Sequence, residues 1–101
     1  MIVSRWQAPV VPDQNQIRMM IEAEGLEPYL ETYEPNSEVN SHRHPFDEVR
    51  IVVQGDLYMD VAGNKLLLRS GDRILIPSNT KHSHKSGPSG LCVCMCAHKT
   101  F

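Results

Sequence analysis

The sequence predicts an all-β protein, a small barrel or sandwich with one short helix near the N-terminus. From residue 29 onward, short β-prone runs alternate with turn residues at regular spacing. Only the segment after Pro12 has apolar residues at helical spacing. A chain of 101 residues has room for a single core. We therefore expect one domain over 1–101, with an N-terminal strand and helix in 1–28 and the barrel in 29–101.

The N-terminal part is expected to be extended over 1–11 and anchored by apolar side chains, namely Ile2, Val3 and Trp6. Asp13 is a suitable helix N-cap, and Gly25 is a natural residue at which to end the helix. The spacing between them predicts one core-facing stripe, formed by Ile17, Met20 and Ile21.

The later strands are expected at 29–33, 42–44, 48–53, 57–61, 65–69, 73–76, 82–84 and 91–97. The last of them carries all three cysteines, Cys92, Cys94 and Cys96, which alternate and so share one face. Cysteines two apart on a strand rarely have disulfide geometry, so we expect free thiols. If they face inward they line the pocket near the metal site described below; the alternative, which we favour, is that they are small buried hydrophobes.

Composition excludes several function classes. Hydrophobic content of 41% is ordinary for a globular chain, and the net charge is only −2. The ten Lys and Arg residues are scattered, which argues against a nucleic-acid partner. No apolar run approaches the roughly 18–20 residues of a membrane helix. The N-terminus lacks the apolar stretch of a signal peptide, so a cytoplasmic location is expected.

A metal site is the strongest functional signal. His42 and His44 stand two apart, Glu48 follows four residues later, and His82 comes from far downstream. Neutral imidazoles and one carboxylate suit one divalent transition metal per chain, with Fe, Mn, Ni, Zn, Co and Cu all possible. Three nitrogens and one oxygen leave positions open for water, substrate or dioxygen. The alternative is four unrelated core or surface residues, but this spacing favours the metal.

The same residues resemble the two cupin motifs. The first reads His42-x-His44, three residues, Glu48, six residues, Gly55. The second reads Gly71, five residues, Pro77-x-Asn79, two residues, His82. The departures from the pattern are Asn36 and Asn79, which replace glycines, and Ser86, which replaces the closing Asn. The chain is thus similar to small single-domain cupins of the cupin 2 or RmlC-like jelly-roll superfamily, in a bacterial subgroup of unassigned function.

The resemblance implies an antiparallel jelly-roll barrel with the metal in its mouth. It also implies a homodimer whose N-terminal segment packs across the partner. The implied function is a metal-dependent enzyme acting on a small polar or acidic molecule, with dioxygenase chemistry leading and isomerase or lyase chemistry behind. One alternative is a sensor or storage barrel that holds a small ligand without turnover. The last is a metal that only ties strands together.

Two further residues are candidates for a catalytic role. Strand alternation points Arg50 into the barrel, where it could clamp a substrate carboxylate. The alternatives for Arg50 are an ion pair with Glu48 or Asp47, or a bulge that turns it outward. His84 shares the face of His82 and could donate to a ligand or carry a proton. The alternative for His84 is a rim position in solvent.

Overall fold

The computed structural model describes residues 1–99, which form nine β-strands and one α-helix. In chain order these are β1 (Ile2–Ser4), α1 (Gln14–Ala23), β2 (Tyr29–Tyr33), β3 (Glu38–His42), β4 (Asp47–Gln54), β5 (Leu57–Val61), β6 (Asn64–Leu68), β7 (Arg73–Ile76), β8 (His82–Ser86) and β9 (Cys92–Lys99). The expected all-β chain with one short N-terminal helix is confirmed.

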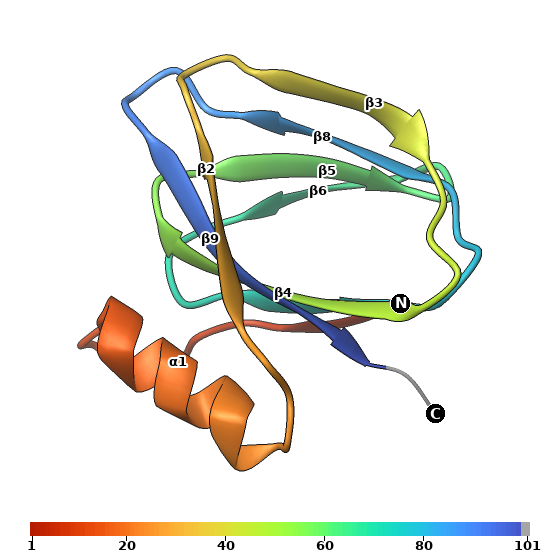
Figure 1. The fold of residues 1–101 in the computed structure, drawn as a ribbon. Coiled ribbons are helices and arrows are strands. Elements are labelled where there is room, and N and C mark those ends of the chain that lie inside the picture. Colours follow the sequence, from red (N-terminus) through yellow and green to blue (C-terminus); the bar gives the residue numbers. More distant parts are fainter. Residues whose placement is uncertain (100–101) are drawn as a thin grey trace.

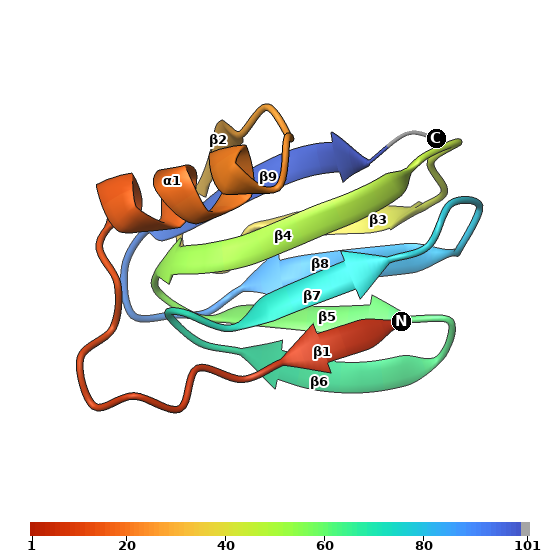
Figure 2. The ribbon, with the colours of Figure 1, turned by 90° about the horizontal axis from the view of Figure 1, so that it is seen from below.

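The strands form two antiparallel sheets that face each other (Figure 1). The larger sheet has the order β1-β7-β4-β9-β2, and the smaller has the order β3-β8-β5-β6. The chain crosses repeatedly between the sheets, as in a jelly roll. Helix α1 lies on the outer face of the larger sheet, beside β4 and β9 (Figure 2).

Two apolar clusters follow from this layering. The first fills the space between the sheets and includes Leu57, Leu68 and Ile76. The second lies between the larger sheet and α1, where Ile17 and Ile21 pack against Val49. Strand β4 is covered on both faces, which explains why it is buried almost continuously instead of at alternate residues.

The helix begins as expected but buries less than expected. Asp13 accepts a hydrogen bond from the backbone N–H of Gln16, whose side chain bonds back to the Asp13 N–H, forming a capping box. Ile17 and Ile21 are fully buried, whereas Met20 is 40% exposed, so its predicted core role is wrong. The helix meets the sheet through a narrow stripe one turn apart, which leaves Met20 on its flank.

The strand predicted at 42–44 is also displaced. Strand β3 occupies Glu38–His42, and His44 lies in the loop that follows. Pro45 lacks a backbone N–H and restricts the residue before it, which ends the strand early. The His44 carbonyl instead accepts a hydrogen bond of 2.6 Å from the Asn79 N–H. The ladder between β3 and β8 is irregular between Val39 and His42.

Gly55 closes the turn after β4 and is expected to tolerate no side chain. Its φ is +82°, and a Cβ there would lie 2.5 Å from the Leu91 carbonyl oxygen. Gly55→Ala should lower the free energy of unfolding by more than the roughly 1–2 kcal/mol of a left-handed alanine. Gly63→Ala is the matched control, because Gly63 has φ +87° but no atom within 4 Å of its Cβ. If urea unfolding showed the same loss of unfolding free energy in both variants, the steric argument would be contradicted.

Asp72 ties the N-terminal segment to the barrel. Its carboxylate accepts hydrogen bonds from the backbone N–H groups of Trp6 and Arg69, each 3.0 Å, and pairs with Arg5. Burial alone would raise the pKa of Asp72, but these N–H groups and Arg5 outweigh it and hold the pKa below its usual value. The lowered pKa means that the folded state favours the ionised form.

We therefore expect Asp72→Asn to cost about 1–3 kcal/mol of stability at neutral pH. The carboxylate stabilises the fold above its unfolded pKa of about 4, and this contribution is lost as pH falls through the lower, folded-state pKa. Urea unfolding of both proteins at several pH values checks this. A difference between wild type and variant that did not shrink in acid would contradict it.

Candidate metal centre

Three histidines converge at one end of the sandwich, between the sheets. His42 ends β3 and is the direct cross-strand partner of His82, which begins β8. The loop after β3 brings in His44. One nitrogen from each ring lies within 4.8 Å of the others. The structure thus brings together three of the four predicted ligands, although they come from segments about forty residues apart.

Hydrogen bonds from Nδ1 orient two of these rings so that the Nε2 atom of each belongs to the cluster. The Nδ1 of His42 lies 2.7 Å from the Asn40 carbonyl, and the Nδ1 of His82 lies 2.8 Å from the Thr80 carbonyl. A carbonyl can only accept, so in each neutral ring Nδ1 carries the proton and Nε2 has a free lone pair. This arrangement is typical of histidines that ligate metals through Nε2.

The geometry of these nitrogens fits a metal ion. Within residues 1–99, the buried Nε2 of His82 has no hydrogen-bond partner. A buried nitrogen without a partner is costly, and a metal would satisfy it. The Nε2 atoms of His42 and His44 are 3.1 Å apart. Two nitrogens each about 2.1 Å from one ion would be separated by a similar distance.

Glu48, the fourth predicted ligand, stands beside this cluster. It lies near the start of β4 and is almost completely buried. Its Oε1 is 3.8 Å from the Nε2 of His44 and 3.3 Å from the Nη2 of Arg50. The carboxylate therefore lies between the histidines and a buried guanidinium, which is a position from which it could complete the donor set.

Arg50 points into the interior, where acceptors already surround its guanidinium. Its Nη2 donates to Glu31 at 2.9 Å and to Glu48, its Nε donates to Glu48 at 3.5 Å, and its Nη1 donates to the Tyr33 hydroxyl at 3.1 Å. Of the roles considered for Arg50, these contacts favour the ion pair with Glu48 over a free clamp for substrate. They also suggest that Arg50 positions the Glu48 carboxylate.

His84 lies two residues beyond His82 on the same inward face of β8. It is only 6% exposed, so it is not a rim residue in solvent. Its ring meets Tyr33 edge-on at 5.0 Å, and in the described chain neither of its nitrogens has a hydrogen-bond partner. Burial and the nearby Arg50 lower the pKa of His84 to about 4, so the ring is neutral at neutral pH.

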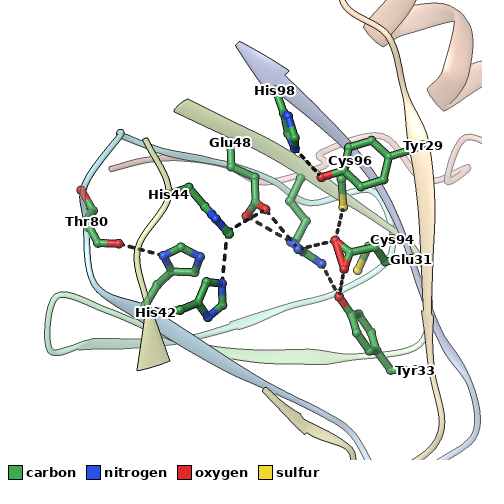
Figure 3. A network of polar contacts seen from close by, with 12 residues as sticks. Tyr29, Glu31, Tyr33, His42, His44, Glu48, Thr80, Cys94, Cys96 and His98 are labelled. Atoms are coloured by element: carbon green, nitrogen blue, oxygen red, sulfur yellow. Dashed lines mark hydrogen bonds and ion pairs between the residues drawn. The ribbon is translucent and has the colours of Figure 1, made fainter. Parts of the chain in front are cut away.

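The cysteines face inward and are free, buried thiols. The Sγ atoms of Cys92 and Cys94 are 4.0 Å apart, and the Cys96 thiol lies 3.4 Å from Glu31 (Figure 3). Burial raises the pKa of Cys96, which keeps its thiol protonated. Cys92 packs in the apolar cluster between the sheets, as a small buried hydrophobe does.

A cavity of about 380 Å³ opens beside the histidines. It is lined by Tyr29, Glu31, Tyr33, Val39, His42, His44, Phe46, Glu48, Arg50, His84 and His98. A second hollow of about 600 Å³ runs along the smaller sheet and is lined by none of the four predicted ligands. The smaller cavity is thus the one that a metal-bound molecule would occupy.

Rings form one wall of this cavity. Phe46 stacks between His44, at 4.8 Å, and His98, at 3.7 Å between ring centroids. The Nε2 of His98 lies 3.0 Å from the Tyr29 hydroxyl (Figure 3). These residues carry no recognisable motif, and only the packing of the strand ends reveals that they line the cavity.

Glu31 is the pocket residue that motif reasoning missed. It accepts hydrogen bonds from Arg50 and from the Tyr33 hydroxyl, the latter at 2.5 Å. Burial would raise the pKa of Glu31, but Arg50 and Tyr33 outweigh it and hold the pKa below its usual range. The available signal was a carboxylate between Tyr29 and Tyr33 at strand spacing, because a charged residue on an inward strand face requires a partner.

A jelly-roll sandwich with convergent histidines at one end defines a class of small barrels built around an internal site. The family described as "Cupin domain" matches residues 29–97. The chain therefore belongs to the cupin family. In the described part of the chain, no helix is long and apolar enough to cross a membrane.

Solved structures with the same fold differ widely in sequence. A cupin superfamily protein from Desulfitobacterium hafniense is 11% identical, with a TM-score of 0.67, over 99% of this chain and 77% of that one. A chain from a crystal structure of the DMSP lyases RdDddP and RnDddQII is 18% identical, with a TM-score of 0.68, over 74% of this chain and 38% of that one. A chain from the crystal structure of Drosophila melanogaster CENP-C bound to CAL1 is 19% identical, with a TM-score of 0.66, over 71% of this chain and 60% of that one.

Such likenesses show the fold alone. The aligned region spans less than two thirds of the CENP-C chain and of the lyase-structure chain. A comparison with curated proteins gives no match.

Proposed function

We propose that this cupin binds one divalent transition metal through His42, His44, His82 and Glu48. The observation that carries the proposal is the convergence of three imidazoles, one with a buried and unpartnered Nε2, beside a cavity. Glu48 would supply the oxygen ligand, and Arg50 would hold that carboxylate in place. The metal could be Fe, Mn, Ni, Zn, Co or Cu.

The proposed activity is that of a metal-dependent enzyme acting on a small polar or acidic molecule, of the dioxygenase type or of the isomerase or lyase type. A bound divalent metal would act as a Lewis acid on ligand oxygen atoms. The ring wall of Phe46 and His98 would limit access of water from one side. His84, neutral and without a partner, is the side chain that is free to exchange a hydrogen bond with the ligand.

Metal analysis of protein from its native source, followed by turnover assays, tests this proposal. Anaerobic loading with Fe(II) and measurement of oxygen uptake on a panel of small oxygen-bearing molecules tests the dioxygenase type. Product analysis without oxygen tests the lyase and isomerase types. Failure of every metal to support turnover would exclude the enzyme, and failure to bind any metal would exclude the site.

One observation favours the second candidate, a barrel that holds a small ligand without turnover. Arg50 is occupied by Glu31, Glu48 and Tyr33, so among residues 1–99 the cavity has few free groups for acid or base chemistry. CENP-C bound to CAL1 shows the same fold in a protein assembly. Ligand-dependent thermal stabilisation of the metal-loaded protein, without product, would support this candidate.

We also propose a homodimer. The N-terminal strand β1 lies at one edge of the larger sheet, where it pairs with β7 and where its outer side is available to a second copy. Light scattering on the purified protein tests this. A monomer at micromolar concentration would contradict it.

A further inference from the structure

The charged groups around the cavity are not equally accessible to a ligand. The side chains of Arg50 and Glu48 are each 3% exposed, whereas that of Glu31 is 33% exposed. The single guanidinium is therefore covered, and a carboxylate stands in front of it. A molecule that enters the cavity therefore meets the Glu31 carboxylate before the guanidinium of Arg50.

Arg50 has little capacity left for an anionic group. Each of its three nitrogens already faces a protein acceptor. The Nε and Nη2 atoms face the carboxylates of Glu48 and Glu31, and Nη1 faces the Tyr33 hydroxyl. These contacts leave one N–H of Nη1 unused, so a ligand carboxylate could bind the guanidinium in bidentate fashion only by displacing Tyr33, Glu31 or Glu48. Displacing either carboxylate would leave it beside another negative charge, in a partly buried place where such charges repel strongly.

Glu31 and His84 are two acceptor-bearing groups on the wall beyond the histidines. Glu31 lies 2.9 Å from Arg50, Arg50 lies 3.3 Å from Glu48, and Glu48 lies 3.8 Å from His44. This chain of contacts places the Glu31 carboxylate a short distance from the metal cluster. Neither nitrogen of the buried His84 has a partner within the described residues. His84 lines the same cavity, so its ring can exchange a hydrogen bond with a ligand there.

We infer that the ligand of this site has two unlike ends: an anionic oxygen group at the metal, and an ammonium or other N–H donor against Glu31. The inference rests on the proposed function, because the metal holds the first end. An ammonium beside Glu31 forms a charge-assisted hydrogen bond. A second carboxylate in the same place meets like charge, and such a juxtaposition discriminates between ligands.

The test uses Co(II)-loaded protein and three matched ligands. These are 4-aminobutyrate, glutarate and pentanoate, which share a carboxylate and three methylenes and differ at the far end. The shorter set of 3-aminopropionate, succinate and butyrate covers a smaller span. Titration followed by the visible spectrum of Co(II) yields a Kd for each. We expect the better amino acid to bind at least about tenfold tighter than its dicarboxylate, a typical effect of one charge-assisted hydrogen bond.

The variant Glu31→Gln tests whether Glu31 causes the preference for the amino acid. It is expected to bring the ratio of amino acid to dicarboxylate affinity near one and to leave pentanoate and butyrate binding unchanged. The wild-type ratio decides the inference even if this variant fails to fold. The inference would be overturned if the dicarboxylates bound as tightly as the amino acids at both lengths, or if neither amino acid bound. It would also be overturned if the ratio of amino acid to dicarboxylate affinity were unchanged in Glu31→Gln.

Failure of the metal site gives a different result. A Co(II) spectrum that is absent, or that is unaffected by replacing His82, refutes the proposed metal centre. A spectrum that depends on His82 but shows no preference for the amine refutes only the ligand class.

Discussion

Replacing His82 with alanine is expected to abolish tight metal binding. Among residues 1–99, His82 supplies the buried Nε2 that has no hydrogen-bond partner, and it lies directly across from His42 in the smaller sheet. Losing even a hydrogen-bond partner of a ligand costs about 10–100-fold in metal affinity, so loss of a ligand should cost more than about 100-fold. Competition titration with a chromophoric chelator measures the Kd for Co(II) or Zn(II).

The same variant should separate binding from folding. Metal that binds only the folded state raises the unfolding temperature of the wild type, and this rise should vanish in His82→Ala. His98→Ala is the matched control, since it removes an imidazole from the same cavity but not from the cluster. Metal affinity lost equally in both variants, or retained in His82→Ala, would contradict the assignment.

The second large effect is expected at Arg50. Its guanidinium lies between Glu31 and Glu48, and its pair with Glu48 is almost fully buried. Arg50→Met should lower the free energy of unfolding by about 3–5 kcal/mol, because removing one partner leaves a buried charge uncompensated. Urea unfolding of the metal-free protein measures this loss without contributions from the ion.

A compensating variant makes the argument specific. Replacing Arg50 with Met and Glu48 with Gln together removes both buried charges, so this double variant should recover part of the lost stability. It should not recover metal binding, because the carboxylate ligand is absent. If Arg50→Met lowered the free energy of unfolding by less than about 1 kcal/mol, the loss would be that of an exposed ion pair. Such a result would exclude tight coupling between Arg50 and its carboxylate partners.

The fold could be predicted largely from local patterns. The N-cap at Asp13 and the strand at 57–61 are local features, and each lies where the sequence places it. Met20 and His44 are the exceptions. Whether Met20 is buried depends on how wide a stripe of α1 the sheet covers, and where β3 ends depends on Pro45 and on a hydrogen bond from distant Asn79.

For the candidate site, spacing predicted the residues of the metal cluster but not the full set of contacts around Arg50. His42, His44, Glu48 and His82 could be proposed because ligand spacing and strand parity are written in the chain. Alternation also placed Arg50 and His84 on inward faces. Glu48 was among the partners considered for Arg50, but Glu31 could not be read in this way, because it comes from β2, a strand that is not adjacent to β4 in the sheet.

By itself, the sequence determined the all-β class and the short helix, since these depend on periodicity and turn residues. Its resemblance to the two cupin motifs indicated the family and four candidate metal ligands. Only the tertiary structure decided which charge a ligand would meet. Strands β2 and β4 both pair with β9, and so they bring Glu31 in front of Arg50. Contact between strands so far apart in the chain is a result of packing, which no local pattern encodes.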